Sequence, residues 1–350
     1  MTQMAFVLPA IKGFQAGREY YVSMIPLEVI PRLFQFSDDS LPPEERSQRI
    51  LNRSRIPEIR DYILSNPTSY VFSALTVSID GSVRFTPVDG KDGCIGRIEI
   101  PMESRFLIND GQHRQAAISE AIRINPELKD EHISVVFYHD EGLQRSQQMF
   151  SDLNRYAIRP TKSINILFNS RESSSVIAKK VTDGVPVFRN RTEKEKTTIS
   201  NRSRALFTLS SICTATEELL RDIEEDENRK IDLAIRYWTG VSQHIPQWID
   251  VEHNRMKPSE LRKNFICSFS ITLVALGYGG NALLRNYPES WEQLLSNLDS
   301  MDWRKDNRVW NDLVFVNGKI AANRSTQKAM SEYIKNIMTK NIGDCHVQPD

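Results

Sequence analysis

The chain has 350 residues, and its 45 lysines and arginines balance its 45 aspartates and glutamates, so the formal net charge is zero. Apolar residues make up 40% of the chain, which exceeds what disordered proteins contain and indicates a globular fold. At roughly 150 residues per domain, this length predicts about two domains. Zero net charge excludes a protein coated with basic residues, but a local basic face is enough to bind nucleic acid.

The cysteines and the N-terminal residues indicate the cellular compartment in which the protein is expected. The 4 cysteines lie far apart, and none belongs to a CxxC or Cys/His pair, which argues against a zinc site and fits a reducing cytosol. Residues 1–13 lack the basic start and apolar block of a signal peptide. The apolar stretch 265–276 is too short to span a bilayer and is expected to be a buried core helix. We therefore expect a cytoplasmic protein with no membrane partner.

The first 160 residues mix strand and helix patterns. Residues 4–25 are predicted to be extended around a turn at 13–17, and residues 26–36 to be helical. A second helical pattern covers residues 44–65 and is broken near Pro57. The remaining predicted elements are strands at 69–79, 83–88, 95–100, 105–109 and 133–138, and helices after Gly111 and at 143–155.

Strand patterns become rare after Pro160. Helical patterns are found at 163–180, 198–226, 229–245, 259–276, 289–298 and 326–340. The sequence therefore predicts an α+β protein, with a mixed α/β domain over residues 1–160 and an α-helical domain over residues 161–350. The 5 tryptophans lie in these helical surroundings and are expected in the core.

The most informative local feature is the segment 106–117, FLINDGQHRQAA, in which a predicted strand ends in a polar turn and a helix begins at once. Free N–H groups at a helix start favour an anion. Gly111 would let the backbone approach a ligand, and Arg114 offers a planar fork for phosphate. His113 could donate to a phosphate or transfer a proton, and Asp110 could cap the helix or bind a metal. The alternative is an ordinary turn with an aspartate cap.

A second polar group follows in the predicted helix 143–155. Gln148, Asp152 and Arg155 lie at spacings of four and three, which places them on one stripe of the helix. A carboxylate and a guanidinium so arranged could hold a metal-bound nucleotide. A local ion pair at a solvated helix end is the alternative.

The segment 189–204 is the most polar part of the second domain, and we expect an exposed loop there. Its basic residues could follow a phosphate backbone, although a solvated loop explains them equally well. The candidate DNA-binding residues are Arg189, Arg191, Lys194, Lys196, Arg202 and Arg204.

The motif Asp-Gly-Gln-His-Arg at 110–114 resembles the signature of the DGQHR-domain proteins. The block 150–163, FSDLNRYAIRPTKS, resembles the matching block of the DndB family of DNA sulfur modification proteins. DndB proteins are regarded as repressors that bind the promoter region of the phosphorothioation gene cluster. The resemblance therefore implies a DNA-binding transcriptional regulator whose partner is double-stranded DNA.

The DGQHR domain is also similar to the ParB/sulfiredoxin fold, in which a Gly-x-x-Arg motif cradles nucleotide phosphates. Gly111 and Arg114 match that motif. In ParB a Glu-Asn-x-x-Arg motif helps to hold metal and phosphates, and here Ser151 and Asp152 replace its first two residues, which puts metal binding and hydrolysis in doubt. Sulfiredoxin needs a cysteine in the motif turn, and this chain has none there, so the sequence argues against sulfinate reduction.

The alternative function is therefore a nucleotide-binding protein or NTPase of the same system, with an NTP and Mg²⁺ as its cofactors. It assigns catalysis to Asp110, Gln112, His113 and Arg114. It assigns phosphate binding to Gly111, Arg114, Asp152, Asn154 and Arg155, and Mg²⁺ to Asp110 and Asp152. A nuclease or structural partner in the modification system is a third interpretation. A homo-oligomer is left open.

Overall fold

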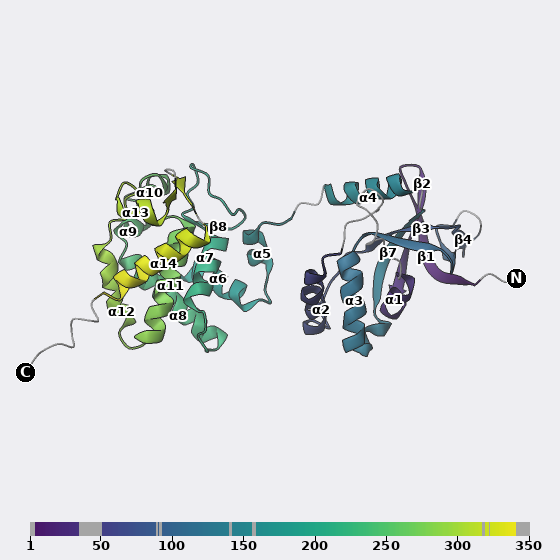
Figure 1. Ribbon diagram of the computed structural model, residues 1–350, viewed down its shortest axis with the longest axis horizontal. Coiled ribbons are helices and arrows are strands. Elements are labelled where there is room, and N and C mark those ends of the chain that lie inside the picture. Colours follow the sequence, from purple (N-terminus) through teal and green to yellow (C-terminus); the bar gives the residue numbers. More distant parts are fainter. Residues whose placement is uncertain are drawn as a thin grey trace, which may run out of the picture. The chain divides into compact units, whose positions relative to one another are not determined.

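The computed structural model describes residues 4–34, 51–88, 90, 93–139, 142–155, 159–316, 319–321 and 323–340 (Figure 1). The chain divides into two compact units, Met1–Ile158 and Arg159–Asp350, and each is described by itself. This division falls two residues before the boundary predicted from the sequence.

The N-terminal unit is built on a seven-stranded sheet with the order β4-β5-β1-β2-β7-β3-β6. Neighbouring strands are antiparallel except β3 and β7, which run parallel, so the sheet is mixed. The strands are β1 Ala5–Gln15, β2 Arg18–Pro26, β3 Leu75–Asp80, β4 Arg84–Pro87, β5 Ile95–Pro101, β6 Arg105–Asp110 and β7 His132–His139. The helices are α1 Ile30–Leu33, α2 Ile56–Ser65, α3 Gln112–Ile124 and α4 Leu143–Arg155, with 3₁₀ turns at Leu27–Val29, Arg53–Arg55 and Pro126–Asp130.

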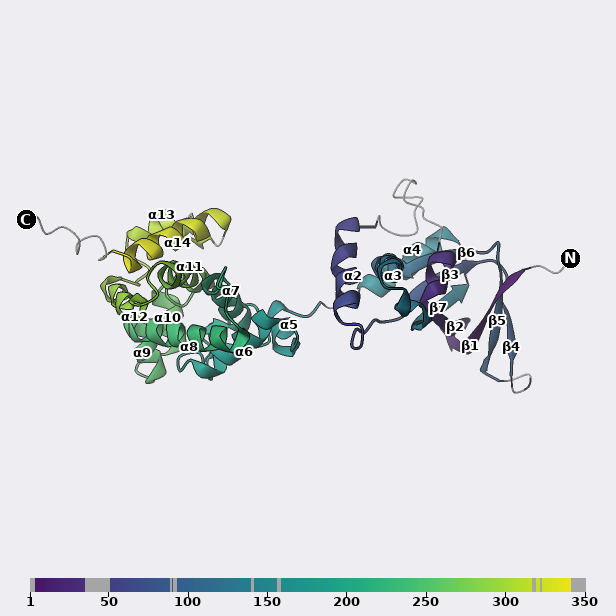
Figure 2. The same ribbon diagram turned by 90° about the horizontal axis from the view of Figure 1, so that it is seen from below.

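Alternate side chains of β6 face different helices, because successive residues of a strand point to opposite faces of a sheet. Phe106 packs edge-on against Phe34, at the end of α1, within the same core as α3. Asn109 points to the other face, where its Nδ2 donates to the Ser78 hydroxyl at 2.6 Å and to the Met149 sulfur of α4 at 3.2 Å. The two views accordingly show α1, α2 and α3 on one face and α4 on the other (Figures 1 and 2).

Two predictions for this unit are corrected. The strand predicted from residue 69 begins only at Leu75, because residues 66–70 form a turn in which the Asn66 carbonyl accepts bonds from two later amides. Pro57 does not break a helix but lies in the first turn of α2, where its missing N–H costs nothing. The predicted helical residues 35–36 and 44–50 lie outside the described residues.

The C-terminal unit is mainly helical, as the sequence predicts. Its helices are α5 Lys162–Phe168, α6 Ser173–Gly184, α7 Leu209–Leu219, α8 Glu227–Gln243, α9 Pro246–Glu252, α10 Pro258–Asn264, α11 Ser270–Asn286, α12 Trp291–Leu294, α13 Val309–Leu313 and α14 Arg324–Met338, with a 3₁₀ helix at Leu295–Ser300. Two short strand pairs complete it, namely β8 Thr192–Glu193 with β9 Phe207–Thr208, and β10 Phe315–Val316 with β11 Lys319–Ile320. The protein is therefore α+β.

Helix α11 forms the centre of this unit, packed between α7 and α14 (Figure 2). The close approach requires glycine, because a Cβ at Gly277 would lie 2.1 Å from the Ala215 carbonyl oxygen. The prediction that the tryptophans belong to the core is confirmed: all five are buried. Within the described part of the chain, no helix is long and apolar enough to cross a membrane.

Three helices predicted for this unit are interrupted or shortened. Residues 198–206 form a loop, and α7 begins only at Leu209. The helix predicted at 163–180 is divided at Asn169, whose side chain accepts the N–H groups of residues 171 and 172. The helix predicted at 259–276 is divided at 265–269, where the Ile266 amide donates to the Trp303 carbonyl instead of continuing a helical turn.

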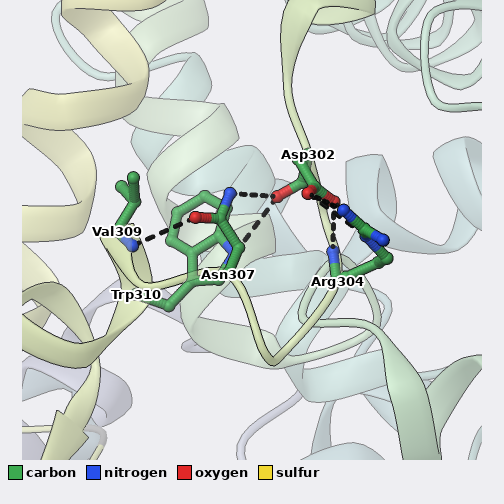
Figure 3. Close-up of polar contacts among 5 residues, drawn as sticks. All are labelled: Asp302, Arg304, Asn307, Val309 and Trp310. Atoms are coloured by element: carbon green, nitrogen blue, oxygen red, sulfur yellow. Dashed lines mark hydrogen bonds and ion pairs between the residues drawn. The ribbon is translucent and has the colours of Figure 1, made fainter.

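The turn that leads into α13 is held by side chains (Figure 3). The Asp302 carboxylate accepts from the Arg304 guanidinium at 2.7 Å, and this hydrogen bond lowers the pKa of Asp302. The Asp302 carbonyl accepts from Asn307 Nδ2 and Trp310 Nε1, each at 3.2 Å. The Asn307 side chain also accepts the Val309 amide at 3.1 Å, so the residues between 302 and 310 are fixed.

We expect the cysteines to differ in reactivity. Burial raises the pKa of the Cys213 thiol to about 12 and also raises that of Cys267, so neither forms the nucleophilic thiolate at pH 8, whereas Cys94 is exposed. Iodoacetamide labelling of the native protein, located by peptide mass spectrometry, should therefore modify Cys94 and spare Cys213 and Cys267 until the chain is unfolded. Rapid native labelling of either buried thiol would contradict the packing described.

Candidate functional site

The strand–turn–helix junction predicted from the DGQHR motif is present in the N-terminal unit. Strand β6 ends at Asp110, Gly111 follows with φ +104°, and α3 begins at Gln112. This backbone conformation favours glycine, and a Cβ at Gly111 would also lie 2.4 Å from Leu75 Cδ2. Gly111 is therefore explained by the turn itself, whatever the motif binds.

Arg114 makes contacts that the sequence did not reveal. Its Nη1 donates to the Ser73 carbonyl at 2.7 Å, to the Ala74 carbonyl at 3.2 Å and to the Ser73 hydroxyl, while its Nη2 donates to Asp110 at 2.8 Å. The side chain is 15% exposed. The guanidinium thus fastens the segment that enters β3 and pairs with the first residue of its own motif. Together with the turn at 66–70, these bonds to the carbonyls of residues 73 and 74 account for the late start of β3.

The remaining motif residues lie around this anchor. The Nε2 of His113 accepts the Asn52 amide at 3.2 Å, which assigns the ring proton of a neutral histidine to Nδ1. The N-cap residue of α3 is Gly111, which has no side chain to cap the helix, and Asp110 does not serve as the N-cap it was predicted to be. Asp110 bonds to Arg114 instead, and the phosphate-binding and catalytic roles of the motif stay predictions.

The second block forms helix α4 with the predicted bounds. Gln148 Nε2 donates to the Asp152 carboxylate at 2.7 Å, and Asn154 Nδ2 donates to the Phe150 carbonyl at 2.8 Å. Asp152, Asn154 and Arg155 are all exposed. Helix α4 lies against β6. The described residues contain no group of three or more His, Cys, Asp or Glu side chains that could hold a metal.

The basic segment of the C-terminal unit borders a hollow of about 810 Å³, which we call the first hollow. Four of the six predicted DNA-binding residues line it, namely Arg189, Arg191, Arg202 and Arg204, and Lys257 adds a fifth cation. Glu252 is the single carboxylate in this lining. A chain without net charge therefore carries a strongly positive concave surface, which attracts phosphate groups.

The six predicted residues are not equivalent. Arg202 and Arg204 are exposed and form no ion pair with any described residue, so their guanidiniums are available to a ligand. Arg191 Nη2 donates to Asn254 at 2.7 Å, which fixes its side chain in the wall. Lys194 lies 3.4 Å from Asp183, and neither it nor Lys196 belongs to the lining.

Arg262 holds the loop that carries Arg202 and Arg204. Its guanidinium donates to four backbone carbonyls of that loop, those of Ser200, Asn201, Ser203 and Ala205. The surrounding burial lowers the pKa of Arg262, yet arginine stays charged at any physiological pH. Sequence reasoning missed Arg262 and Lys257. The signal that could have found them is a second basic run, with Arg255, Lys257, Arg262 and Lys263 within nine residues.

We expect Arg114→Ala to loosen the N-terminal unit. Losing hydrogen bonds from a largely buried charge to backbone carbonyls should cost about 2–3 kcal/mol. Amide hydrogen exchange should accelerate at residues 71–77 and 111–118. All five tryptophans lie in the C-terminal unit, so their fluorescence should not change. Arg123→Ala, at an exposed position of α3, is the matched control. Unchanged exchange in the Arg114 variant would contradict the anchoring role.

Comparison with known proteins gives the family. The model of the DndB family, described as DNA-sulfur modification-associated, matches residues 8–341, which is nearly the whole chain and includes both units. No curated protein and no solved structure matches the chain. The match supports a role in the DNA phosphorothioation system and confirms the resemblance of the chain to DndB. The chain belongs to the DndB family of DNA-sulfur modification-associated proteins.

Proposed function

We propose that this protein is a DNA-binding transcriptional regulator, a repressor of a phosphorothioation gene cluster, and that it binds double-stranded DNA at the first hollow. The observation that carries the proposal is the lining of this hollow, in which four arginines and a lysine surround one carboxylate. Cations concentrated on one concave surface match a backbone with one negative charge per roughly 1.7 Å of duplex axis.

The lining suits both backbone contact and base contact. Arg202 and Arg204 offer bidentate forks that fit phosphate oxygens or the O6 and N7 atoms of guanine. Asn190 and Ser203 border the same hollow and add neutral donors and acceptors. Because Arg262 fixes the loop backbone, less conformational freedom is lost when DNA binds.

Repression is the finer part of the proposal and rests on the family. Phosphate contacts position a protein on a duplex without distinguishing sequences, so the hollow alone supports DNA binding and not the choice of promoter. The regulatory role is proposed from the family resemblance, because DndB proteins are regarded as repressors of the modification cluster.

We expect the double variant Arg202→Ala/Arg204→Ala to weaken binding to the native upstream duplex. If each residue contacts one phosphate, the slope of log K against log salt should fall by about 1.8, and affinity at 0.15 M salt should drop roughly 30-fold. Fluorescence anisotropy with a labelled duplex measures both quantities.

The matched control is Arg229→Ala/Lys230→Ala, which removes two positive charges from α8, outside the hollow, one on the exposed Arg229 and one on the half-buried Lys230. This variant should keep both the slope and the affinity. If both double variants lost the same affinity and slope, the loss would be explained by the change in net charge and not by the hollow. Wild-type protein that binds promoter and scrambled duplex equally at moderate salt would overturn the repressor proposal.

Nucleotide binding at the DGQHR motif is the second candidate. The start of α3 favours it, because the N-cap Gly111 has no capping side chain and the first amides of a helix attract anions. The contacts of Arg114 weigh against it, since a phosphate would have to compete with Asp110 and with the carbonyls of residues 73 and 74.

Thermal unfolding tests this candidate. ATP, GTP or CTP with Mg²⁺, present at 100 times its dissociation constant, should stabilise the N-terminal unit by about 2.7 kcal/mol. Hydrogen exchange at residues 111–116 should slow at the same time. If none of the three nucleotides shifts the unfolding curve, the NTPase alternative is wrong and DNA binding is unaffected.

A further inference from the structure

The same loop also borders a second basic hollow. It has a volume of about 680 Å³. Its polar lining includes Asn201, Ser259, Arg262, Lys263, Asn264 and Lys305. Ser259 lines both hollows, and the loop 199–204 contributes to both.

Short helix α10 supplies both hollows with cations. Lys257 precedes its first residue and lines the first hollow, whereas Lys263 lies near its end and lines the second. Arg262, between them in the sequence, donates to the loop carbonyls and thereby fixes the boundary between the hollows. The two cavities are therefore parts of one rigid basic surface.

The cations of the second hollow have different roles. Lys305 Nζ donates to the Arg262 carbonyl at 2.7 Å and lies 4.4 Å from the centre of the Phe269 ring. These contacts occupy Lys305 and brace α10 against the turn shown in Figure 3. Lys263, in contrast, is exposed and forms no ion pair with any residue the structure describes. Its ammonium group is available to a ligand.

We propose that the second hollow binds the sugar-phosphate backbone of the same DNA duplex that occupies the first, with Lys263 contacting a phosphate. The side-chain amides of Asn201 and Asn264 supply neutral hydrogen-bond donors to the same backbone. Glu260 is the single carboxylate in this lining, so the positive surface continues past the loop. This inference rests on the proposed DNA binding and extends its contact surface to Lys263, a cation that lies outside the basic segment 189–204.

Salt-dependent anisotropy on the full-length protein with the native upstream duplex tests the inference. Lys263→Ala and Lys263→Gln should each lower the slope of log K against log salt by about 0.9, and should weaken binding at 0.15 M salt roughly 5-fold. Combining Lys263→Ala with Arg202→Ala should lower the slope by about 1.8, because two separate phosphate contacts add. Lys230→Ala is the control, and circular dichroism melting verifies that each variant folds.

The outcomes separate the two proposals. If Arg202→Ala/Arg204→Ala weakens binding while both Lys263 variants keep the wild-type slope and affinity, the second hollow does not contact DNA and the first-hollow proposal stands. If the Lys263 variants lose affinity for RNA of the same sequence but not for duplex DNA, the inference is likewise overturned. Wild-type protein that binds no duplex at all contradicts the proposed function itself.

Discussion

The proposed DNA-binding surface depends on one guanidinium. The loop 200–205 and its neighbours bring several positive side chains together, and without a fixed backbone their mutual repulsion would spread them apart. Arg262 prevents this by donating to four loop carbonyls, and Lys305 donates to the Arg262 carbonyl in turn. The arrangement costs folding free energy, because Nε of Arg262 is buried with no hydrogen-bond partner in the described structure. It leaves Arg202 and Arg204 oriented but unneutralised, which is the state an anionic ligand requires.

Arg114 has a comparable role in the N-terminal unit, where it donates hydrogen bonds to the carbonyls of residues 73 and 74. Both arginines act as internal donors to irregular backbone, which would otherwise be left without partners. This similarity changes how the DGQHR motif is understood. The turn with positive φ requires Gly111, and the segment that enters β3 requires the hydrogen bonds of Arg114. The fold therefore explains both residues even without a ligand. The start of α3, where the N-cap Gly111 has no capping side chain, is the part of the motif to which the nucleotide proposal still applies.

Local pattern predicted the parts of the fold that local physics determines. The junction at 110–112, helix α4 and strand β7 follow from periodicity and turn chemistry, and the structure has them within one or two residues of the prediction. The errors at 69–74 and 198–206 both involve an arginine distant in the sequence. Arg114 binds the carbonyls of residues 73 and 74, after the turn at 66–70, and Arg262 binds four carbonyls of the loop 200–205. For the candidate site, composition identified four of the lining cations but could not separate Arg202 from Lys194, which pairs with Asp183. It also could not find Arg262, whose role depends on contacts across about 60 residues of sequence.

In this proposal DNA binds to the C-terminal unit, and Arg114 of the DGQHR motif has a mainly structural role. Hydrogen–deuterium exchange of the full-length protein, with and without the native upstream duplex, tests this assignment most directly. We predict that the duplex slows exchange at residues 189–191, 199–205 and 254–264, while residues 105–124 exchange at the same rate. Slowed exchange confined to residues 105–124 and 143–155, with the basic loop unchanged, would contradict the account.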